Sequence, residues 1–377
     1  MSRTPFDLGR RSLLQAGAAA AVAGMPFASA WAAAPALELV ASFKGQVTGV
    51  AVSPKGRIFV NFPRWEEDVA VSVAEVGRNG ALTPYPNAAW NAYRDAKPGV
   101  TPSLVAQQFV CVQSITVDPL GNLWVLDPAA PGLAFEVPGG PKLVRIDLAT
   151  NKISRVYAFD DTVAPQGSYL NDIRFTPDGQ RAVMTNSGQP GCLVAFDVAS
   201  GQARRVLDGH PSTQFQPNVA VVVNGHDLRR GDGAPPQFSA DGLALDTRGE
   251  YAYWQATTGT TMYRVPVAAL FDAQMTPEQL AAKVELYVQT FVADGYWMAR
   301  NGVLHLTSCS DNAVKRMQPD RSFVTEMRDS RLLWPDSMAE GADGSIYVTA
   351  SHIPQMKAWQ GPGVRQTQLF RFRPTAA

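Results

Sequence analysis

Six stretches of the chain share one nine-residue pattern of polar and apolar positions. Each copy begins with a polar residue, continues with apolar residues that alternate with others, and has glycine at the ninth place. The copies span residues 48–56, 113–121, 171–179, 241–249, 294–302 and 336–344. Alternation with a period of two predicts a strand, and the closing glycine supplies the positive φ of a tight hairpin turn. The pattern therefore predicts six strands that each enter a hairpin.

Further apolar strands follow each of these turns. Second strands are predicted at residues 57–60, 122–125, 182–184, 251–254, 303–306 and 345–348. Third strands are predicted at residues such as 142–147, 192–197, 262–265 and 369–372, and several of them are followed by a turn and a fourth strand. Each unit is therefore predicted to be a four-stranded antiparallel meander.

The number and spacing of the units predict an all-β fold, a six-bladed β-propeller. Six units in about 345 residues give about 57 residues each, close to the length of known blades plus their loops. The early strand at 37–40 is predicted to complete the last blade beside 369–372, which closes the ring and covers free sheet edges. One helix outside the core is predicted at 276–284, where Thr276 caps the helix and Pro277 follows.

The N-terminal segment has the pattern of an export signal. Arg10 and Arg11 precede a short run rich in alanine and glycine, and small residues follow at positions 28–30. This arrangement predicts a twin-arginine signal peptide over residues 1–30, cleaved near Ala30 or Ala34, and a propeller over residues 31–377. An uncleaved N-terminal anchor is the alternative. The apolar run is too short to span a membrane, so a periplasmic or secreted location is expected.

Composition limits the classes of partner. The 33 Lys and Arg residues balance 33 Asp and Glu residues, so charge suggests no nucleic-acid partner. Cys111, Cys192 and Cys309 are interpreted as small buried hydrophobic residues, with one disulfide and one free thiol as the alternative. The four histidines form no HxH or HExxH pair, which argues against a transition-metal site. Oligomeric state is not readable from the sequence.

Polar side chains are expected to converge at one mouth of the central channel. The innermost strand of every blade starts at the same mouth, so the first residues of the repeats should meet there. These residues are Thr48, Gln113, Asn171, Asp241, Asp294 and Asp336. The ends of second strands should bring Arg64, Trp65, Asn186 and His352 to the same mouth. Such convergence is typical of a ligand site, although a hydrated polar ring without a ligand is the alternative.

Three carboxylates close together have a chemical consequence. Like charges disfavour joint ionisation, so the group must bind a cation or raise the pKa of at least one member. An oxygen-liganded ion such as Ca²⁺ is one candidate cation. The chain has no GxSxG motif and no phosphate-binding loop, so nucleophilic serine chemistry and nucleotide binding find little support.

An ordered series of motifs resembles the major royal jelly / yellow protein family. The matching segments are residues 59–65, 169–174, 185–188, 241–245, 262–266 and 333–337, spread over nearly the whole predicted propeller. The resemblance implies a secreted six-bladed propeller. It also implies binding of small ligands, biogenic amines among them, at the central channel, and it points to dopachrome isomerisation as one activity of the family.

Two positions also look like those of the gluconolactonase / senescence marker protein family. Asn171, in its Asn-Asp-Ile context, and Asp241, in Asp-Gly-Leu, match the metal ligands at the blade starts of that family. The resemblance implies that this aspartate also acts as the base in lactone hydrolysis. The chain departs from that family at Thr48, where the family has a glutamate ligand.

The leading hypothesis is an exported yellow-like propeller that binds a small polar or aromatic molecule at the channel mouth, with isomerase activity as an option. Asp241 and Asp336 would anchor an ammonium or other polar group, and Asn171 with Gln113 would orient it. The remaining contacts are Trp65 and Arg64, which would cover an aromatic or anionic part.

Two alternatives belong to other functional classes. In a calcium-dependent lactonase-type hydrolase, Asn171, Asp241 and one further carboxylate would hold Ca²⁺, and a carboxylate such as Asp336 would activate water. In a protein-interaction platform, loops such as 224–233 would carry the contacts. The residues alone do not decide between a binding protein, an enzyme and a platform.

Overall fold

The structure is a computed structural model, and it describes residues 36–375 except 66–68, 95–103, 134 and 365. Residues 35–377 form one compact unit. The predicted signal peptide lies outside the described residues, so its boundary stays a prediction.

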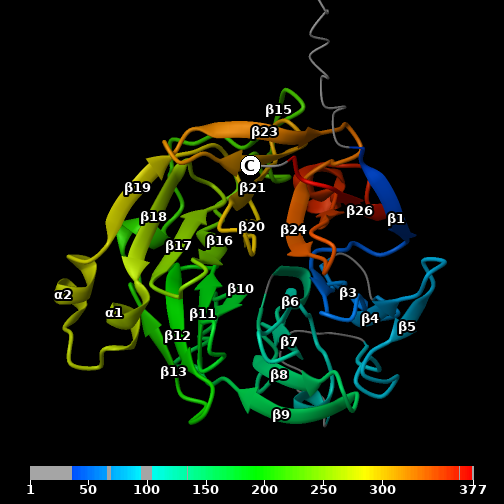
Figure 1. Cartoon of the computed structure of the whole chain (residues 1–377), viewed down its shortest axis with the longest axis horizontal. Coiled ribbons are helices and arrows are strands. Elements are labelled where there is room, and N and C mark those ends of the chain that lie inside the picture. Colours follow the sequence, from blue (N-terminus) through cyan, green and yellow to red (C-terminus); the bar gives the residue numbers. More distant parts are fainter. Residues whose placement is uncertain (1–35, 66–68, 95–103, 134, 365, 376–377) are drawn as a thin grey trace, which may run out of the picture. The chain divides into compact units, whose positions relative to one another are not determined.

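Six four-stranded antiparallel sheets and one two-stranded sheet are present in the described residues. The first three blades consist of β2 (Val50–Val52), β3 (Ile58–Asn61), β4 (Val73–Val76) and β5 (Leu82–Pro84); β6 (Ser114–Val117), β7 (Asn122–Asp127), β8 (Lys142–Asp147) and β9 (Lys152–Ala158); and β10 (Leu170–Phe175), β11 (Arg181–Asn186), β12 (Cys192–Asp197) and β13 (Ala203–Val206). The innermost strands β6, β10, β16, β20 and β24 lie around a common centre (Figure 1).

The other three blades complete the ring. They consist of β16 (Ala240–Leu245), β17 (Tyr251–Ala256), β18 (Thr261–Pro266) and β19 (Glu285–Gln289); β20 (Tyr296–Met298), β21 (Leu304–Ser308), β22 (Ala313–Met317) and β23 (Phe323–Arg328); and β24 (Pro335–Glu340), β25 (Ile346–Ala350), β26 (Thr367–Phe372) and β1 (Glu38–Phe43). The predicted six-bladed propeller is therefore confirmed, as is its closure, because β1 pairs with β26 with Leu39 opposite Phe370.

Short helices and one extra hairpin lie between the blade strands. They are η1 (Val105–Gln107), η2 (Pro131–Leu133), η3 (Pro211–Thr213), β14 (Val222–Val223), β15 (His226–Asp227), α1 (Val267–Phe271), α2 (Pro277–Ala281), η4 (Ile353–Gln355) and η5 (Lys357–Trp359). The helix predicted at 276–284 is α2, and its capping box joins the side chains of Thr276 and Gln279 to each other's backbone N–H. The helix lies at the outer edge of its blade (Figure 1).

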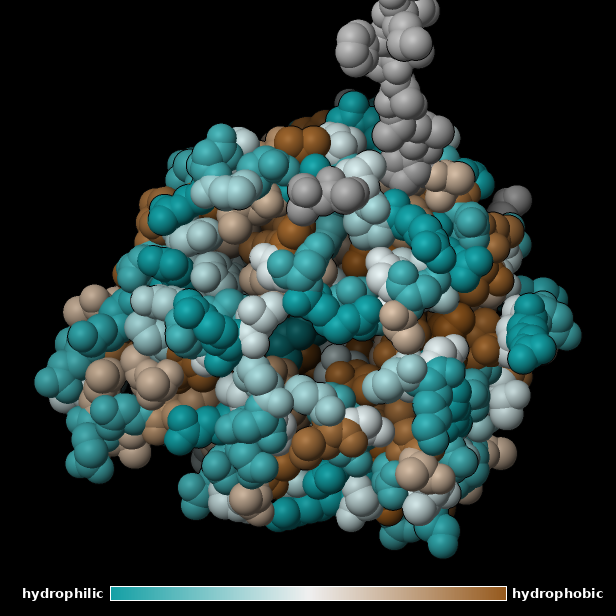
Figure 2. Space-filling model, viewed as in Figure 1, coloured by the Kyte–Doolittle hydropathy of each residue, from teal (hydrophilic) through white to brown (hydrophobic). Residues whose placement is uncertain are grey.

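The hydrophobic core lies mainly between adjacent blades. Trp124 of β7 stacks on Tyr157 in its own blade and packs against Phe175 and Phe196 of the next blade. Because neighbouring blades cover both faces of each blade in this way, the innermost strands are almost entirely buried. The surface seen in Figure 2 mixes hydrophilic and hydrophobic patches and is hollowed near its centre.

The three cysteines are buried and free. Their interpretation as small buried hydrophobic residues is confirmed, and the alternative with one disulfide is wrong. Cys111 lies in a cluster with Val110 and Val137, and Cys309 contacts the cluster around Trp334. Among the described residues, no helix is long and apolar enough to cross a membrane.

Candidate functional site

A cavity of about 570 Å³ lies where the inner strands of five blades begin. Its lining includes residues on the inner strands or just before them, which are the first residues of five of the six repeats: Gln113, Asn171, Asp241, Asp294 and Asp336. Loops supply an aromatic wall, which consists of Trp65, Phe135, Tyr169, Phe238, Trp334 and Trp359. The predicted convergence of repeat starts is therefore seen at five positions.

The sixth repeat start, Thr48, does not line this cavity. It is fully buried, and its hydroxyl donates to the carbonyl oxygen of Gln113 at 2.9 Å. The same hydroxyl oxygen accepts a hydrogen bond from the amide of Asn61 at 2.9 Å. Thr48 thus joins the first blade to the second. The structure gives no support to its predicted contact with a ligand.

One side of the cavity carries a chain of neutral hydrogen bonds. The indole N–H of Trp65 donates to the hydroxyl of Tyr169 at 2.6 Å, and that hydroxyl donates to Gln113 Oε1 at 2.9 Å. Gln113 Nε2 then donates to Asn171 Oδ1 at 3.2 Å, and Asn171 Nδ2 donates to Ser187 Oγ at 3.0 Å. Gln113 and Asn171 each accept one hydrogen bond of this chain through the amide oxygen and donate the next through the amide nitrogen. The orientation of both side-chain amides is therefore fixed.

The other side of the cavity carries the three aspartates. Asp241, Asp294 and Asp336 are 7%, 8% and 5% exposed. Burial, followed by the charge of Asp294, raises the pKa of Asp241 and of Asp336 well above the usual range. Burial also raises the pKa of Asp294 to about 7, although a hydrogen bond from the Trp334 indole lowers it. No ion pair of the described residues includes any of the three.

A fourth buried aspartate next to this group is balanced by a basic residue. Asp172 Oδ2 accepts a hydrogen bond from Arg174 at 3.0 Å, and Arg174 also donates to the carbonyl oxygen of Tyr296 at 2.9 Å. Tyr296 belongs to β20, so Arg174 connects the inner strands of the third and fifth blades. Arg174 therefore compensates the charge of Asp172, whereas no Lys or Arg of the described residues forms an ion pair with the three cavity aspartates.

The described residues do not fit a calcium ion as they are placed. Nowhere in the described ranges do three His, Cys, Asp or Glu side chains form a group that could hold a metal ion. The side-chain oxygen of Asn171, a predicted ligand, already accepts a hydrogen bond from Gln113. Asp241, the second predicted ligand, lines the same cavity. Asn171 and Asp241 thus line the same cavity, and one lone pair of the Asn171 amide oxygen is used by Gln113.

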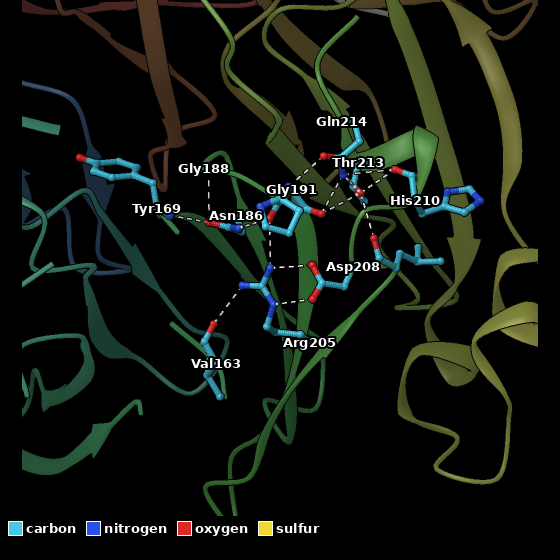
Figure 3. A network of polar contacts seen from close by, with 12 residues as sticks. Val163, Tyr169, Asn186, Gly188, Gly191, Arg205, Asp208, His210, Thr213 and Gln214 are labelled. Atoms are coloured by element: carbon cyan, nitrogen blue, oxygen red, sulfur yellow. Dashed lines mark hydrogen bonds and ion pairs between the residues drawn. The ribbon is translucent and has the colours of Figure 1, made fainter. Parts of the chain in front are cut away.

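Asn186 lies outside the cavity lining. Its side-chain oxygen accepts hydrogen bonds from the backbone N–H groups of Tyr169 at 2.5 Å and Gly188 at 3.3 Å. Its amide donates to the carbonyl oxygen of Pro190 at 2.8 Å, within the polar network shown in Figure 3. Asn186 therefore holds the loops that carry Tyr169 and Gly188, which do line the cavity.

Arg64 and His352 are also not part of the cavity lining. The Arg64 guanidinium is buried and donates to Ser72 Oγ at 3.1 Å and to the carbonyl oxygen of Tyr93. His352 contacts Gln355 and Gln368 through its two ring nitrogens, at 3.2 and 2.9 Å. Burial lowers the pKa of His352, so its neutral form is favoured. Their predicted roles in ligand binding have no support from this arrangement.

Several cavity residues were not predicted as site residues. Tyr169 and Trp334 each lie two positions before a repeat start, at Asn171 and Asp336, so a periodic signal for them exists in the sequence. Phe238, Trp359 and Arg230 come from long loops without any repeat. They reach the cavity through contacts such as the edge-to-face pair of Phe238 and Trp359, with ring centroids 5.4 Å apart.

Fold and site together define a six-bladed β-propeller with a polar and aromatic cavity at one mouth of its central channel. Residues 110–360 match the family model described as "Major royal jelly protein". The chain belongs to this family, which confirms the resemblance found in the motifs. No curated protein sequence matches the chain.

Solved structures with similar folds include a gluconolactonase from Xanthomonas campestris (TM-score 0.53, 12% identity, 90% of each chain covered). They also include the calcium-binding protein regucalcin from Agrobacterium tumefaciens (TM-score 0.53, 14% identity, 90% of this chain and 96% of that chain covered). A luciferin-regenerating enzyme has a TM-score of 0.54 at 11% identity, with 91% of this chain and 96% of that chain covered. At these identities the likeness concerns the fold.

Proposed function

We propose that the chain binds a small organic cation, an amine with an apolar or aromatic body, in this cavity. The observation that carries the proposal is the group of three buried aspartates without a basic partner among the described residues. Buried carboxylates are costly unless a positive charge compensates them. A ligand ammonium group would supply that charge and would restore the ionised form of the carboxyls.

The aromatic wall supports the same class of ligand. Ring faces attract cations, and large rings exclude water from an apolar ligand body. Trp334 both lines the cavity and donates its indole N–H to Asp294 Oδ2, so it holds one carboxylate in place. The neutral chain from Trp65 to Ser187 presents amide groups in one fixed orientation on the opposite side. Asp241 and Asp336 would anchor the ammonium group, as predicted from the repeats.

A calcium-dependent lactonase-type hydrolase is the second candidate. Asn171 and Asp241 line one cavity, and structures of similar fold are named as a gluconolactonase and a calcium-binding protein. The Asn171 amide oxygen already accepts a hydrogen bond from Gln113 at 3.2 Å, so one lone pair would remain for an ion. No step of the amine-binding proposal passes through a metal ion.

Calorimetric titration of the protein with 2-phenylethylamine and its uncharged analogue 2-phenylethanol tests the proposal. We expect the amine to bind at least about tenfold more tightly, and Asp336→Asn to lower its affinity by about tenfold. Affinity should rise between pH 6 and pH 8, because Asp294, whose pKa is about 7, loses its proton in that range. The control Glu278→Gln removes an exposed carboxylate on α2 and should leave affinity unchanged.

Two results would decide against amine binding. Equal binding of the amine and the alcohol would show that the carboxylates do not recognise charge. Stabilisation by Ca²⁺ that EDTA reverses and Asp241→Asn abolishes, without any effect of amines, would favour the hydrolase instead.

A further inference from the structure

The cavity lining also includes one arginine, Arg230, whose charge is opposite to that of an ionised aspartate. Arg230 lines the cavity and lies on the loop after β15. Its guanidinium carbon is 5.8 Å from the centroid of the Trp359 ring, which is also part of the wall. Among the described residues, no carboxylate forms an ion pair with Arg230, whereas the neighbouring Arg229 pairs with Asp227 at 3.0 Å.

The backbone at Arg230 is held on both sides. Its N–H donates to the carbonyl oxygen of Ala234, and its own carbonyl oxygen accepts from Gly233 N–H, both at 2.9 Å. The side-chain amide of Gln360 donates to the same carbonyl oxygen at 2.6 Å. Asp232, the nearest acidic residue in this turn, accepts a hydrogen bond from Ala234 N–H at 2.9 Å. The turn is therefore ordered, and its arginine keeps its charge available to a ligand.

The cavity lining thus includes three carboxyl groups and one guanidinium group. The aspartates lie at the starts of inner strands, whereas Arg230 lies on a loop and is exposed to solvent. A sphere of the cavity's volume would be about 10 Å across, enough for a ligand with one ring or a short chain between its two charged groups. Glu136, the remaining acidic residue of the lining, is engaged by the backbone N–H of Gly167 at 3.0 Å.

We propose that the ligand is a zwitterion whose ammonium and carboxylate groups lie at opposite ends of an apolar body. This inference rests on the proposed function. The ammonium group binds the aspartates, and the body packs against the aromatic wall. The carboxylate binds the guanidinium of Arg230, whose planar donors match a carboxylate. An α-amino acid does not meet these conditions, because its two charges are adjacent.

Calorimetric titrations with three probes at pH 8 and low salt test this inference. The probes are 4-(aminomethyl)benzoate, 4-methylbenzylamine and phenylalanine. We expect 4-(aminomethyl)benzoate to bind about fivefold more tightly than 4-methylbenzylamine, the magnitude of a partly exposed ion pair, and phenylalanine to bind more weakly than both. Arg230→Gln should reduce the ratio of the first two affinities to about one. Arg229→Gln, the matched control at a paired arginine, should leave that ratio at about five.

The outcomes separate this inference from the proposal on which it rests. Equal affinities for 4-(aminomethyl)benzoate and 4-methylbenzylamine, or a ratio that survives Arg230→Gln, would overturn the zwitterion and leave amine binding intact. If 4-methylbenzylamine and 2-phenylethylamine both fail to bind, amine binding is itself wrong and the zwitterion is excluded with it. If the affinity ratio of 4-(aminomethyl)benzoate to 4-methylbenzylamine falls to about one in Arg229→Gln, the carboxylate binds at Arg229 and the role of Arg230 is wrong.

Discussion

At the scale of single residues, the surroundings of an aspartate decide whether its ionised form is stabilised or destabilised. Burial raises the pKa of Asp294 to about 7, because water no longer solvates its ionised form. Asp329 shows the opposite behaviour, since a hydrogen bond from Arg331 lowers its pKa. The same residue type therefore destabilises or stabilises the fold as pH rises, according to its partners.

Replacing Asp294 with asparagine should change how stability depends on pH. The folded state retains the Asp294 proton to a higher pH than the unfolded state, so stability from this group is full below about pH 4 and is lost as the pH rises toward 7. Asparagine can still accept the Trp334 hydrogen bond. We expect Asp294→Asn to be about 1–3 kcal/mol more stable than the natural protein at pH 8, with little difference at pH 4.

Urea denaturation at both pH values measures this difference. Asp329→Asn is a control of opposite sign, because a lowered pKa contributes stability above about pH 4 that is lost as the pH falls. An Asp294→Asn variant that is less stable than the natural protein at pH 8 would mean that the carboxylate is compensated in the fold.

At the scale of secondary-structure elements, the hairpin between the first two strands of each blade is the repeated unit. The ninth-position glycines all have positive φ, between 68° and 83°, and each donates its N–H to the carbonyl oxygen three residues earlier. Side chains of the first and second strands then join neighbouring blades. Ser114 Oγ donates to the carbonyl oxygen of Asn171, and Thr185 Oγ1 donates to that of Asp241. These hydrogen bonds fix the positions of the cavity residues on neighbouring blades relative to one another.

Alanine substitutions should rank the hairpin glycines by their surroundings. At Gly121, with φ of 83°, an added Cβ would meet no atom within 4 Å, so only backbone strain remains. We expect Gly121→Ala to lower the free energy of unfolding by about 1 kcal/mol. At Gly249 the added Cβ would lie 2.6 Å from Pro177 Cδ, which adds a clash to the strain. Gly249→Ala should therefore cost about 3 kcal/mol.

Urea denaturation of both variants tests this ranking. Gly231 has open space and no positive φ, so Gly231→Ala should change the free energy of unfolding by less than about 0.5 kcal/mol. Equal costs at positions 121 and 249 would contradict the contribution of the Pro177 contact.

At the scale of the whole molecule, the ring closes through a strand from the beginning of the described chain. β1 and β26 are paired over five residue pairs, from Glu38 opposite Arg371 to Phe43 opposite Thr367. Closure protects the edge of the last blade, and it places the loop 353–359 beside the loop that carries Phe238 and Arg230. The cavity wall therefore depends on segments from both halves of the chain.

Export is a proposal that concerns the whole chain. The paired arginines, Arg10 and Arg11, lie outside the described residues. If these residues are a twin-arginine signal, replacing Arg10 and Arg11 by lysine should retain the protein in the cytoplasm. Cell fractionation with immunodetection measures this, and unchanged export of the double variant would contradict the twin-arginine route. Gln15→Asn is a control that leaves the arginine pair intact.

The repeat by itself determined most of the fold and part of the site. A strand and its turn depend on residues next to each other, so the period of two and the ninth glycine were sufficient to predict six blades. The regular start of each inner strand was sufficient to predict that Asp241, Asp294 and Asp336 converge. A resemblance in motifs was sufficient for the family.

Only the tertiary structure decided which of the polar residues remain available to a ligand. Asp172 follows Asn171 directly, yet it is compensated by Arg174, and Arg64 turns to Tyr93 although its neighbour Trp65 lines the cavity. Arg230 and Trp359 are more than a hundred residues apart and meet at the cavity wall. Periodicity describes neighbours along a strand, whereas partners across blades and loops are set by packing of the closed ring, which no local pattern records.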